Sequence, residues 1–264
     1  MILCNGVSNM SIGQPKELGH DYTRVDVYRR AAAEILATGM DYKGLAIHAQ
    51  AAIHEKVGRI AAESLRPGAW VLDLAAGTGA MCLRLKDLGF VPTACDLVPE
   101  NFRLHGEVDF FEMNLNNCFP VGFRAVFDWV IAIDIIEHIE NPRHFLHQCF
   151  AALQPSGLLI ISTPNIGSPT SRAAYVRTGA FRWFHDENYR VDGHITPITL
   201  FGMRTMIEEA GFTTSAITSV GATSSRGIMH WKTRLLVRLI EFLARDKPLS
   251  GDILVVSARR AALG

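Results

Sequence analysis

The ten residues VLDLAAGTGA at positions 71–80 constrain the fold of this chain more than any other stretch. The largely apolar run Val71–Leu74 predicts a buried parallel strand. Gly77 and Gly79 follow, and because glycine has no Cβ they allow positive φ angles and a close approach of a ligand to the main chain. A helical period resumes after Gly79, so the stretch predicts a strand, a tight loop and a helix N-terminus, an order typical of sites for nucleotide-like ligands. The alternative is an ordinary turn at a strand end.

The phosphate-binding signatures of nucleotide sites are incomplete at this loop. The chain has no GxxxxGK[ST] sequence, and Cys82 stands where the dinucleotide fingerprint GxGxxG requires its third glycine. Asp73, just before the loop, would repel a bound phosphate but attract an amine. The loop therefore predicts a ligand that presents an amine here instead of a phosphate.

Predicted strands and helices alternate along most of the chain. Such alternation implies parallel strands joined by crossover helices, hence a doubly wound α/β sheet. We expect a mostly parallel seven-stranded sheet with N-terminal helices and a lid insertion after the fifth strand. Beyond the first strand and its helix, strands are expected at residues 91–96, 108–114, 125–134, 158–164, 213–220 and 252–259, and helices at 21–38, 45–65, 142–153 and 200–210.

A single domain is expected over residues 21–264, since 264 residues with 48% hydrophobic content can bury one full core. The predicted parts are a loose leader (1–20), N-terminal helices (21–66), a ligand-binding core (69–164), a lid (165–199) and a C-terminal helix with strands (200–264).

The charge balance and the cysteine content limit the partners and the cellular compartment that we expect for this chain. Lys plus Arg equals Asp plus Glu at 26 each, so no overall basic field favours nucleic acid as a partner. The five cysteines are scattered without a CxxC pair and are interpreted as free or buried thiols of a reducing compartment. The N-terminus lacks a signal-peptide pattern, and no apolar run reaches the roughly 18 residues of a membrane span. We therefore expect a cytoplasmic location.

Five segments, in order, resemble the class I S-adenosylmethionine (SAM)-dependent methyltransferases, and the resemblance covers roughly residues 45–259. The downstream motifs are similar to a bacterial branch related to ubiquinone and small-molecule O-methyltransferases. Any one segment is weakly specific, whereas all of them at these intervals are strongly specific. They are VLDLAAGTGA, ACD, FDWVIAIDIIEHI, LQPSGLLIISTPN and the downstream set TPNIGSPTSR, GHITPIT and EEAGF.

The resemblance implies SAM as the cofactor and a partner for each of its parts. The glycine loop would let the methionyl part lie against the backbone, with Asp73 near its ammonium group. Asp96 would accept hydrogen bonds from both ribose hydroxyls unless it is a solvated acid in a turn, and Asn114 would accept from the adenine amine. The family often has glycine where this chain has Ala75, which is small enough to keep the loop. The implied cofactor contacts are Asp73, Ala75, Gly77, Thr78, Gly79, Asp96, Leu97, Asn114, Leu115, Ile133 and Asp134.

The connection between the second and third predicted strands is short. Residues 97–107 barely accommodate a crossover helix with its turns, and Pro99 and Gly106 disfavour one. We therefore expect only a turn or two here, with the adenine end of the pocket shallow or covered by another segment such as the N-terminal helices.

Two histidines are candidate catalytic bases, because a hydroxyl acceptor loses its proton as its oxygen attacks the methyl group. His138 follows the fourth strand, at the edge where open α/β sheets bind ligands, and imidazole titrates near neutral pH. Alternatively, His138 orients the following helix. Glu137 is either its partner beside the substrate or a solvent-facing side chain. His194, in GHITP, is the second candidate.

The lid is rich in aromatic residues that can line an acceptor pocket or form the lid's own small core. His185 taken alone favours a surface position. His144 and His147 lie three apart on a predicted helix without further ligands in register, so no metal site is predicted. The predicted acceptor contacts here are Tyr175, Trp183, Phe184 and His185.

The absence of other signatures narrows the acceptor. The end of the fourth strand lacks the [DNS]PP[YF] sequence of adenine and amide N-methyltransferases, and no basic RNA-binding appendage is present. A hydroxyl of a small molecule, glycan or lipid-linked intermediate is therefore favoured. Two other functions stay open: a nicotinamide-dependent oxidoreductase, which would bind NAD, and a SAM-binding module without turnover.

Residues 230–247, within a predicted insertion at 226–248, form an amphipathic pattern. A basic face beside tryptophan, phenylalanine and leucine suits the surface of an anionic membrane. The alternative is a helix packed on its own domain or at a dimer interface. One stripe holds Arg234, Arg238, Glu241 and Arg245, and the other holds Trp231, Leu235, Leu239, Phe242 and Leu243.

Overall fold

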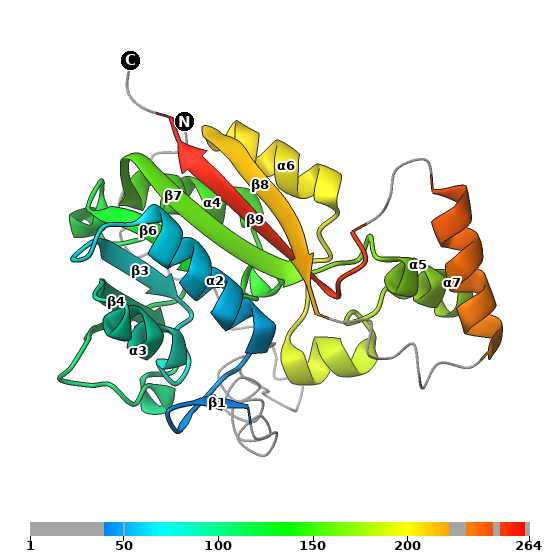
Figure 1. The fold of residues 1–264 in the computed structure, drawn as a ribbon, viewed down its shortest axis with the longest axis horizontal. Coiled ribbons are helices and arrows are strands. Elements are labelled where there is room, and N and C mark those ends of the chain that lie inside the picture. The colour runs from blue at the N-terminus through cyan, green and yellow to red at the C-terminus, as the bar shows by residue number, and fades with distance from the viewer. Residues whose placement is uncertain (1–39, 50, 222–230, 245–248, 262–264) are drawn as a thin grey trace, which may run out of the picture.

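A seven-stranded sheet in the order β5-β4-β3-β6-β7-β9-β8 forms the centre of the computed structural model (Figure 1), which describes residues 40–49, 51–221, 231–244 and 249–261. Neighbouring strands pair in parallel except β9, which runs antiparallel to both β7 and β8. The predicted doubly wound, mostly parallel sheet is confirmed. The strands are β3 (Trp70–Leu74), β4 (Val91–Asp96), β5 (Asp109–Glu112), β6 (Phe127–Ala132), β7 (Leu153–Pro164), β8 (Phe212–Val220) and β9 (Ile253–Arg260).

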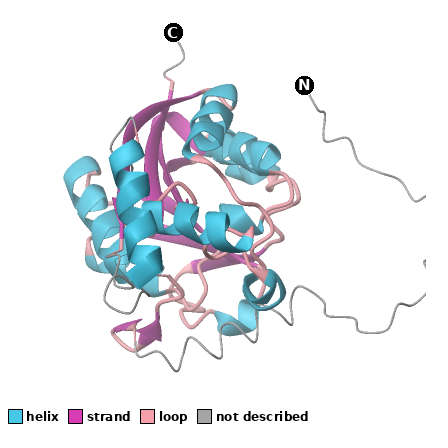
Figure 2. Ribbon diagram, turned by 90° about the vertical axis from the view of Figure 1, so that its right-hand side faces the viewer, coloured by secondary structure: helices cyan, strands magenta, loops and turns pink. Residues whose placement is uncertain are grey.

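Helices cover both faces of the sheet (Figure 2). Two of them, α2 and α3, pack on the face that includes Val71 and Ile131, whereas α4 and α6 pack on the opposite face with Leu72 and Val130. The helices are α2 (Ala51–Ser64), α3 (Ala80–Asp87), α4 (Pro142–Ala152), α5 (Pro169–Thr178), α6 (Leu200–Glu209) and α7 (Trp231–Leu243), with short helical turns η2 (Pro99–Asn101), η3 (Val121–Phe123), η4 (Ile136–His138) and η5 (Asn188–Asp192).

Strand β6 shows why the central strands read as continuous apolar runs. Trp129 and Ile131 belong to the core under α2 and α3, and Val130 and Ala132 belong to the core under α4 and α6. Successive side chains of a strand point to opposite faces, and both faces of this sheet are covered. All four residues are buried, so each of these four positions requires an apolar side chain.

The N-terminal part differs from the prediction. The helix expected from residue 45 begins only at Ala51, because the preceding residues form a hairpin of β1 (Asp41–Tyr42) and β2 (Leu45–Ala46). Gly44 turns the hairpin with φ +84°, and its N–H donates to Asp41 Oδ1 at 2.8 Å. The predicted leader at 1–20 and the helix at 21–38 lie outside the described residues.

Two local predictions have different outcomes. The connection at 97–107 contains only the short turn η2, as expected from its length. The cysteine interpretation is confirmed for the buried, free thiols of Cys82, Cys95 and Cys149, but Cys118 is disulfide-bonded. The prediction of a free thiol is therefore wrong for Cys118, because scattered spacing does not reveal which cysteines folding brings together.

Candidate functional site

A cavity of about 530 Å³ opens at the carboxyl ends of β3, β4 and β6. Its volume falls within the range of about 300–1,000 Å³ for small-molecule sites, and the place is where open α/β sheets bind ligands. Fourteen sequence-predicted site residues line it: Asp73, Ala75, Gly77, Thr78, Asp96, Leu97, Asn114, Leu115, Ile133, Asp134, Glu137, His138, Trp183 and His194.

Four other predicted residues do not line this cavity. Gly79 has φ +89°, and a Cβ there would lie 2.9 Å from the Phe102 ring, so this glycine is required for packing. Tyr175 stacks on Phe181 on the lid, with ring centroids 4.5 Å apart. Phe184 lies beside the site, with its ring 5.5 Å from that of His194, whereas the His185 N–H donates to Asn188 Oδ1 of the lid. Their predicted roles stay predictions.

The glycine loop holds the acid of the second strand in a fixed position. Asp96 Oδ2 accepts from the Gly77 N–H at 2.8 Å, and Oδ1 accepts from the Val98 N–H at 2.9 Å. Gly77 has φ +54°, and a Cβ on it would lie 3.1 Å from His48 Nδ1. Burial raises the pKa of Asp96, and the two backbone N–H groups oppose that shift. The loop therefore presents a carboxylate and bare backbone to the same space.

Asp73 is the most deeply buried acid of this end of the cavity. The side chain is 3% exposed, and its Oδ2 accepts from the Cys82 thiol at 3.1 Å. Burial raises the pKa of Asp73 to about 7, the Cys82 contact lowers it, and the nearby Asp96 charge raises it further. An ammonium group bound beside Asp73 would restore its ionised form.

The Asn114 side chain lines the cavity and also stabilises the turn that follows it. Its Oδ1 accepts from the Asn116 N–H at 3.0 Å and from Asn116 Nδ2 at 3.3 Å. A carbonyl oxygen has two lone pairs, so this turn already uses the acceptor that was predicted to contact adenine. The Asn114 NH₂ group remains as a donor for a ring nitrogen.

The N-terminal segment covers part of the cavity, one of the two expectations for the adenine end, but through individual residues that the sequence analysis did not name. Met40, His48 and His54 line the cavity, together with residues 46–49 around β2. The Thr78 hydroxyl donates to Ala46 O at 2.6 Å, which fastens this segment to the glycine loop. Burial lowers the pKa of His54 to about 4 and also lowers that of His48, so both rings are neutral at pH 7. No local pattern marked these residues, because their contact with the loop arises only from the hairpin.

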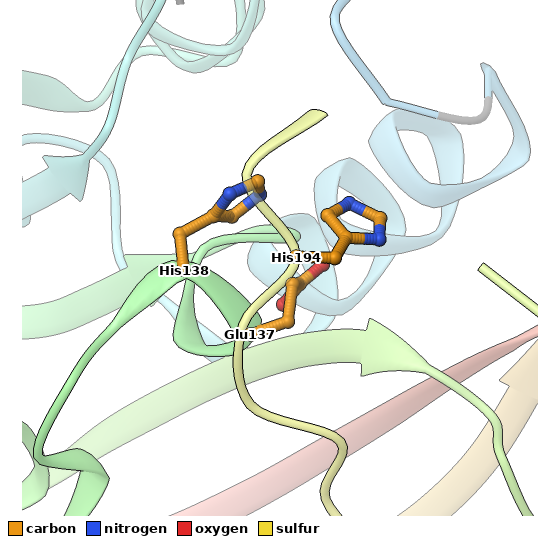
Figure 3. Close-up of side chains that lie close together, drawn as sticks. All are labelled: Glu137, His138 and His194. Carbon is orange, nitrogen blue, oxygen red and sulfur yellow. The ribbon is translucent and has the colours of Figure 1, made fainter. Parts of the chain in front are cut away.

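The opposite end of the cavity combines three chemically active side chains from two segments (Figure 3). Glu137 is fully buried, and its carboxyl oxygens make no hydrogen bond of good geometry among the described residues, although the Thr163 hydroxyl is close enough to lower the pKa of Glu137. His138 Nδ1 donates to Gly193 O at 3.1 Å, and His194 Nδ1 donates to Trp183 O at 2.7 Å. The centroids of the two imidazole rings are 4.9 Å apart. One atom from each of the three residues that could ligate a metal ion lies within 4.8 Å of the other two.

Backbone hydrogen bonds bring His194 to this place. The N–H groups of Ile195 and Thr196 both donate to Glu137 O, at 3.0 and 2.9 Å. The Thr196 hydroxyl donates to Ile139 O at 2.8 Å. Residues 193–196 are therefore fastened along η4, which explains why two histidines distant in sequence share one wall.

The electrostatics of this end favour neutral groups. Burial lowers the pKa of His194, so its imidazole is neutral at pH 7. Burial also raises the pKa of Glu137 well above its usual value, and the neighbouring Asp134 raises it further. A neutral ring whose Nδ1–H is bound to a carbonyl keeps a lone pair on Nε2. Such a nitrogen can accept a proton or bind a cation, and the predicted lack of a metal stays a prediction.

Unpartnered polar atoms concentrate around the cavity. Among the described residues, nine buried side-chain nitrogen and oxygen atoms lack a hydrogen-bond partner. Five of them belong to cavity-lining residues: His48 Nε2, His54 Nδ1, Glu137 Oε1 and Oε2, and Trp183 Nε1. Because most buried polar atoms in proteins are paired with protein groups, ordered water or a ligand, these five atoms can pair with a molecule bound in the cavity. The carboxylates, imidazoles and exposed backbone groups that line the cavity fit a nucleoside with an amino acid tail.

Three non-glycine residues in the cavity wall have positive φ angles. They are Ala75 at 61°, Asp134 at 46° and Trp183 at 70°. The Asp134 conformation is held by Ser162, whose hydroxyl donates to Asp134 Oδ1 at 2.5 Å and accepts from its N–H at 2.9 Å. Backbone strain of this kind clusters at functional sites.

Comparison with known proteins gives one consistent family. A methyltransferase domain family matches residues 45–217. The ubiquinone biosynthesis O-methyltransferase of Bradyrhizobium diazoefficiens is 29% identical over 139 residues, covering 49% of this chain and 54% of that protein. This chain therefore spans about half the length of the curated relatives it matches.

Two solved structures share the fold. A SAM-dependent methyltransferase from Archaeoglobus fulgidus has a TM-score of 0.53 at 17% identity, covering 78% of this chain and 94% of that one. The 1,6-didemethyltoxoflavin-N1-methyltransferase of Burkholderia thailandensis, solved with its substrate and S-adenosylhomocysteine, has a TM-score of 0.56 at 18% identity, covering 95% and 93%. At these identities the likeness concerns the fold alone.

Proposed function

Because this chain belongs to the methyltransferase domain family, as the match over residues 45–217 shows, we propose that it transfers a methyl group from SAM to a hydroxyl of a small organic, glycan or lipid-linked acceptor. The observation that supports a hydroxyl as the methyl acceptor is the pair of imidazoles at the cavity wall, whose ring centroids are 4.9 Å apart. A base is required when the attacking atom is a hydroxyl oxygen, and neutral imidazole suits that role at pH 7.

The cofactor end holds and aligns the methyl donor. SAM, when bound, supplies a methyl group already activated by its sulfonium. Asp73 would hold the ammonium group of the amino acid tail, and Asp96 would hold the ribose hydroxyls. Asn114 would contact the adenine, with the wall formed by His48 and His54 behind the nucleoside. Alignment of this kind can supply several kcal/mol of the barrier reduction without any change in protonation.

Residues at the acceptor end would remove the proton of the acceptor hydroxyl. His138, or His194 beside it, would accept on Nε2 the proton that the acceptor hydroxyl loses when it is methylated. The carbonyls of Gly193 and Trp183 hold the Nδ1–H of each ring, so the rings keep the required tautomer. Glu137 is buried beside the two histidines and its raised pKa keeps it neutral while the rings are neutral; an imidazolium would favour its ionised form, and the two charges would then stabilise each other.

The acceptor class is supported by the chain's relatives and by the wall itself. The curated relatives at 26–32% identity are named ubiquinone biosynthesis O-methyltransferases. Trp183, Ile135 and Ile139 supply apolar surface next to the two histidines. An apolar ring bearing a hydroxyl fits this combination of surfaces.

Two measurements test the proposal. Calorimetric titration with S-adenosylhomocysteine (SAH) and with NAD should give binding of SAH alone. SAH release should then be measured with a panel of phenols, glycans and polyprenyl phenols, and the product identified by mass spectrometry as a methyl ether. Methylation on nitrogen or carbon would contradict the hydroxyl acceptor. Binding of NAD in place of SAH would overturn the whole assignment.

A further inference from the structure

The helix pair α5 and α7 projects from one end of the sheet (Figure 1). The two helices contact each other, and Arg177 of α5 donates to the hydroxyl of Thr233 at 2.5 Å. Thr233 and Val237 are the buried residues of α7. The insertion between β8 and β9 that carries α7 is therefore packed on the lid. The predicted alternative of a helix packed on its own domain accounts for this buried face only.

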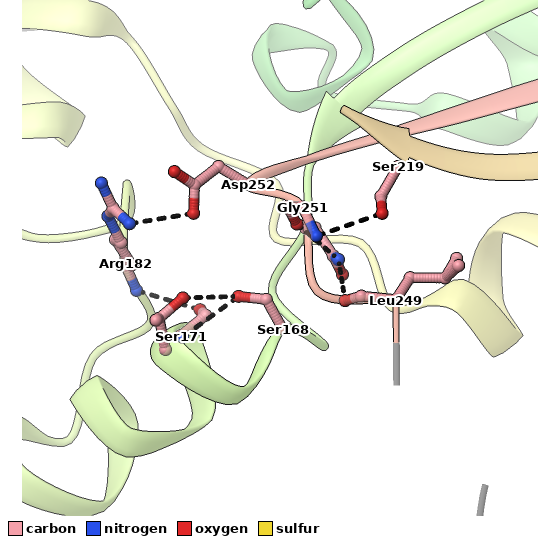
Figure 4. Close-up of polar contacts among 9 residues, drawn as sticks. Ser168, Ser171, Arg182, Ser219, Leu249, Gly251 and Asp252 are labelled. Carbon is pink, nitrogen blue, oxygen red and sulfur yellow. Dashed lines mark hydrogen bonds and ion pairs between the residues drawn. The ribbon is translucent and has the colours of Figure 1, made fainter. Parts of the chain in front are cut away.

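Polar contacts near the start of β9 fix the base of this pair (Figure 4). Arg182 forms an ion pair with the nearly buried Asp252 at 2.9 Å, and its N–H donates to the Ser171 hydroxyl of α5. The Asn165 amide donates to both Leu249 O and Gly251 O. The lid and the last strand are thus joined at one point, which sets where α5 meets the sheet.

The outward face of α7 is apolar. Trp231, Leu235, Leu239 and Phe242 recur every three or four residues, so they share one face of the helix opposite the buried pair. Trp231 and Leu235 are each 62% exposed, and Phe242 is 84% exposed. Of the fifteen large hydrophobic side chains that are exposed among the described residues, seven lie on α5 and α7. Such a concentration marks an interaction surface, since single exposed apolar residues are normal but clusters are not.

Basic residues are concentrated on the two helices that carry this apolar face, although Arg177 itself lies on the buried side of α7, where it donates to Thr233. The described helices α5 and α7 carry five of them, Arg172, Arg177, Lys232, Arg234 and Arg238, against a single acid, Glu241. The whole chain has a net charge of zero, so the positive charge is concentrated here. A second copy of the same basic face would be repelled, whereas a surface of anionic lipids would be attracted.

We propose that the exposed face of α7 docks on the surface of an anionic membrane, with Trp231, Leu235 and Phe242 entering the headgroup region and the flanking arginines contacting lipid phosphates. No helix of the described residues is long and apolar enough to span a bilayer, which is consistent with contact from one side. Docking would hold the protein at the surface that carries a lipid-borne acceptor; this consequence rests on the proposed function, whereas the docking itself does not.

Sedimentation of the full chain with vesicles tests the docking. Phosphatidylcholine vesicles containing phosphatidylglycerol should bind the protein at low salt, and pure phosphatidylcholine vesicles should bind it several-fold more weakly. The double variant Leu235→Glu/Phe242→Glu should reduce binding at least about tenfold, because two buried apolar contacts are lost. The double variant Arg234→Gln/Arg238→Gln should also reduce binding by about tenfold or more, but only on the anionic vesicles.

Phe201→Glu is the matched control, since Phe201 is 79% exposed on α6, away from this surface, and the variant should bind like the wild type. Calorimetry with SAH should give unchanged affinity in every variant, so a failure of docking is distinguishable from a failure of the proposed function. Equal binding to both vesicle types, or no binding at all, would overturn the proposal. So would a dimer in light scattering that the Leu235→Glu/Phe242→Glu variant dissociates, because a second copy would then cover the face.

Discussion

The two ends of the cavity are built in different ways. The cofactor end is built mainly from the last residues of β3 and β4 and the loops that follow them, and these strands are neighbours in the sheet. The acceptor end joins η4 to the segment ending at His194, through a hydrogen bond between His138 and Gly193, which are 55 positions apart. A local sequence pattern can encode the first arrangement, whereas the second depends on the path of the lid. We therefore expect substitutions at the first end to change binding and substitutions at the second to change rate.

The largest effect is expected from His138→Ala at the acceptor end. Loss of a general base should lower kcat by about 100- to 10,000-fold with a hydroxyl acceptor, measured as SAH release at saturating SAM. The SAH affinity should stay within about twofold of wild type, because His138 is not a predicted cofactor contact. His147→Ala, an exposed position on α4, is the matched control and should leave both values unchanged. A parallel loss of SAH affinity in His138→Ala would erase the distinction between the two ends.

Asp96→Asn should give the next largest change, at the cofactor end. The carboxylate accepts two backbone N–H bonds and would accept the ribose hydroxyls, and a hydrogen bond to a charged group contributes about 1.5–3 kcal/mol. SAH affinity measured by calorimetry should therefore fall about 10- to 100-fold. Asp109→Asn, an exposed acid on the adjacent strand β5, should leave the affinity unchanged. An unaffected affinity in Asp96→Asn would mean that the nucleoside binds elsewhere.

The pH dependence of SAH binding separates Asp73 from the other groups. Its pKa of about 7 means that a growing fraction of Asp73 is protonated as the pH falls below 7. An ammonium group binds the ionised form better, so SAH affinity should decrease as the pH falls from 7 to 5.5, by up to about tenfold per unit. The variant Asp73→Asn should bind more weakly at pH 7.5 and lose this slope. A slope that persists in Asp73→Asn would assign the titration to another group.

The same shift has a consequence for stability without ligand. The folded-state pKa of Asp73 is raised above the unfolded value of 3.8, so the folded state holds its proton more tightly. The Asp73 contribution to stability is therefore fully present below about pH 3.8 and is lost as the pH rises through 7. Saturating SAH should remove this loss near pH 7, which can be followed as a larger ligand-induced rise in Tm at pH 7.5 than at pH 5.5. An equal rise at both values would argue against an ionised Asp73 in the complex.

The smallest effect is expected from relief of backbone strain in the glycine loop. Ala75 has φ +61°, which costs an L residue about 1–2 kcal/mol, partly offset by the greater unfolded-state entropy of glycine. Ala75→Gly should therefore raise the free energy of unfolding by about 0.5–1 kcal/mol in denaturant titration. Ala125→Gly is the control, since Ala125 has φ +53° outside the cavity and should gain similar stability. Only Ala75→Gly should alter SAH affinity, and equal effects of both on binding would show that the strain has no role at the site.

The seven-stranded sheet was predictable because its central strands are buried on both faces and therefore read as apolar runs with sharp ends. The cofactor end was predictable for the same reason, since Asp73 and Asp96 mark the tips of two such strands. The residues of the wall around His48 were not predictable individually, because the hairpin at 41–46 interrupts the amphipathic pattern that predicted a helix from residue 45. Gly79 was predicted as a cofactor contact from the local pattern alone, and that role stays a prediction; only the tertiary structure shows that Phe102 leaves no room for a side chain there.

The amino-acid sequence by itself determined the order of strands and helices, the glycine loop and the paired acids, because these features depend on local periodicity and on side chains next to one another in the chain. Only the tertiary structure decided that His194 meets His138 over Glu137, and that the apolar face of α7 points outward while Thr233 and Val237 pack on α5. Those outcomes depend on long-range backbone hydrogen bonds and on which of the two faces of α7 packs against another element. The local pattern of a single segment determines neither of them.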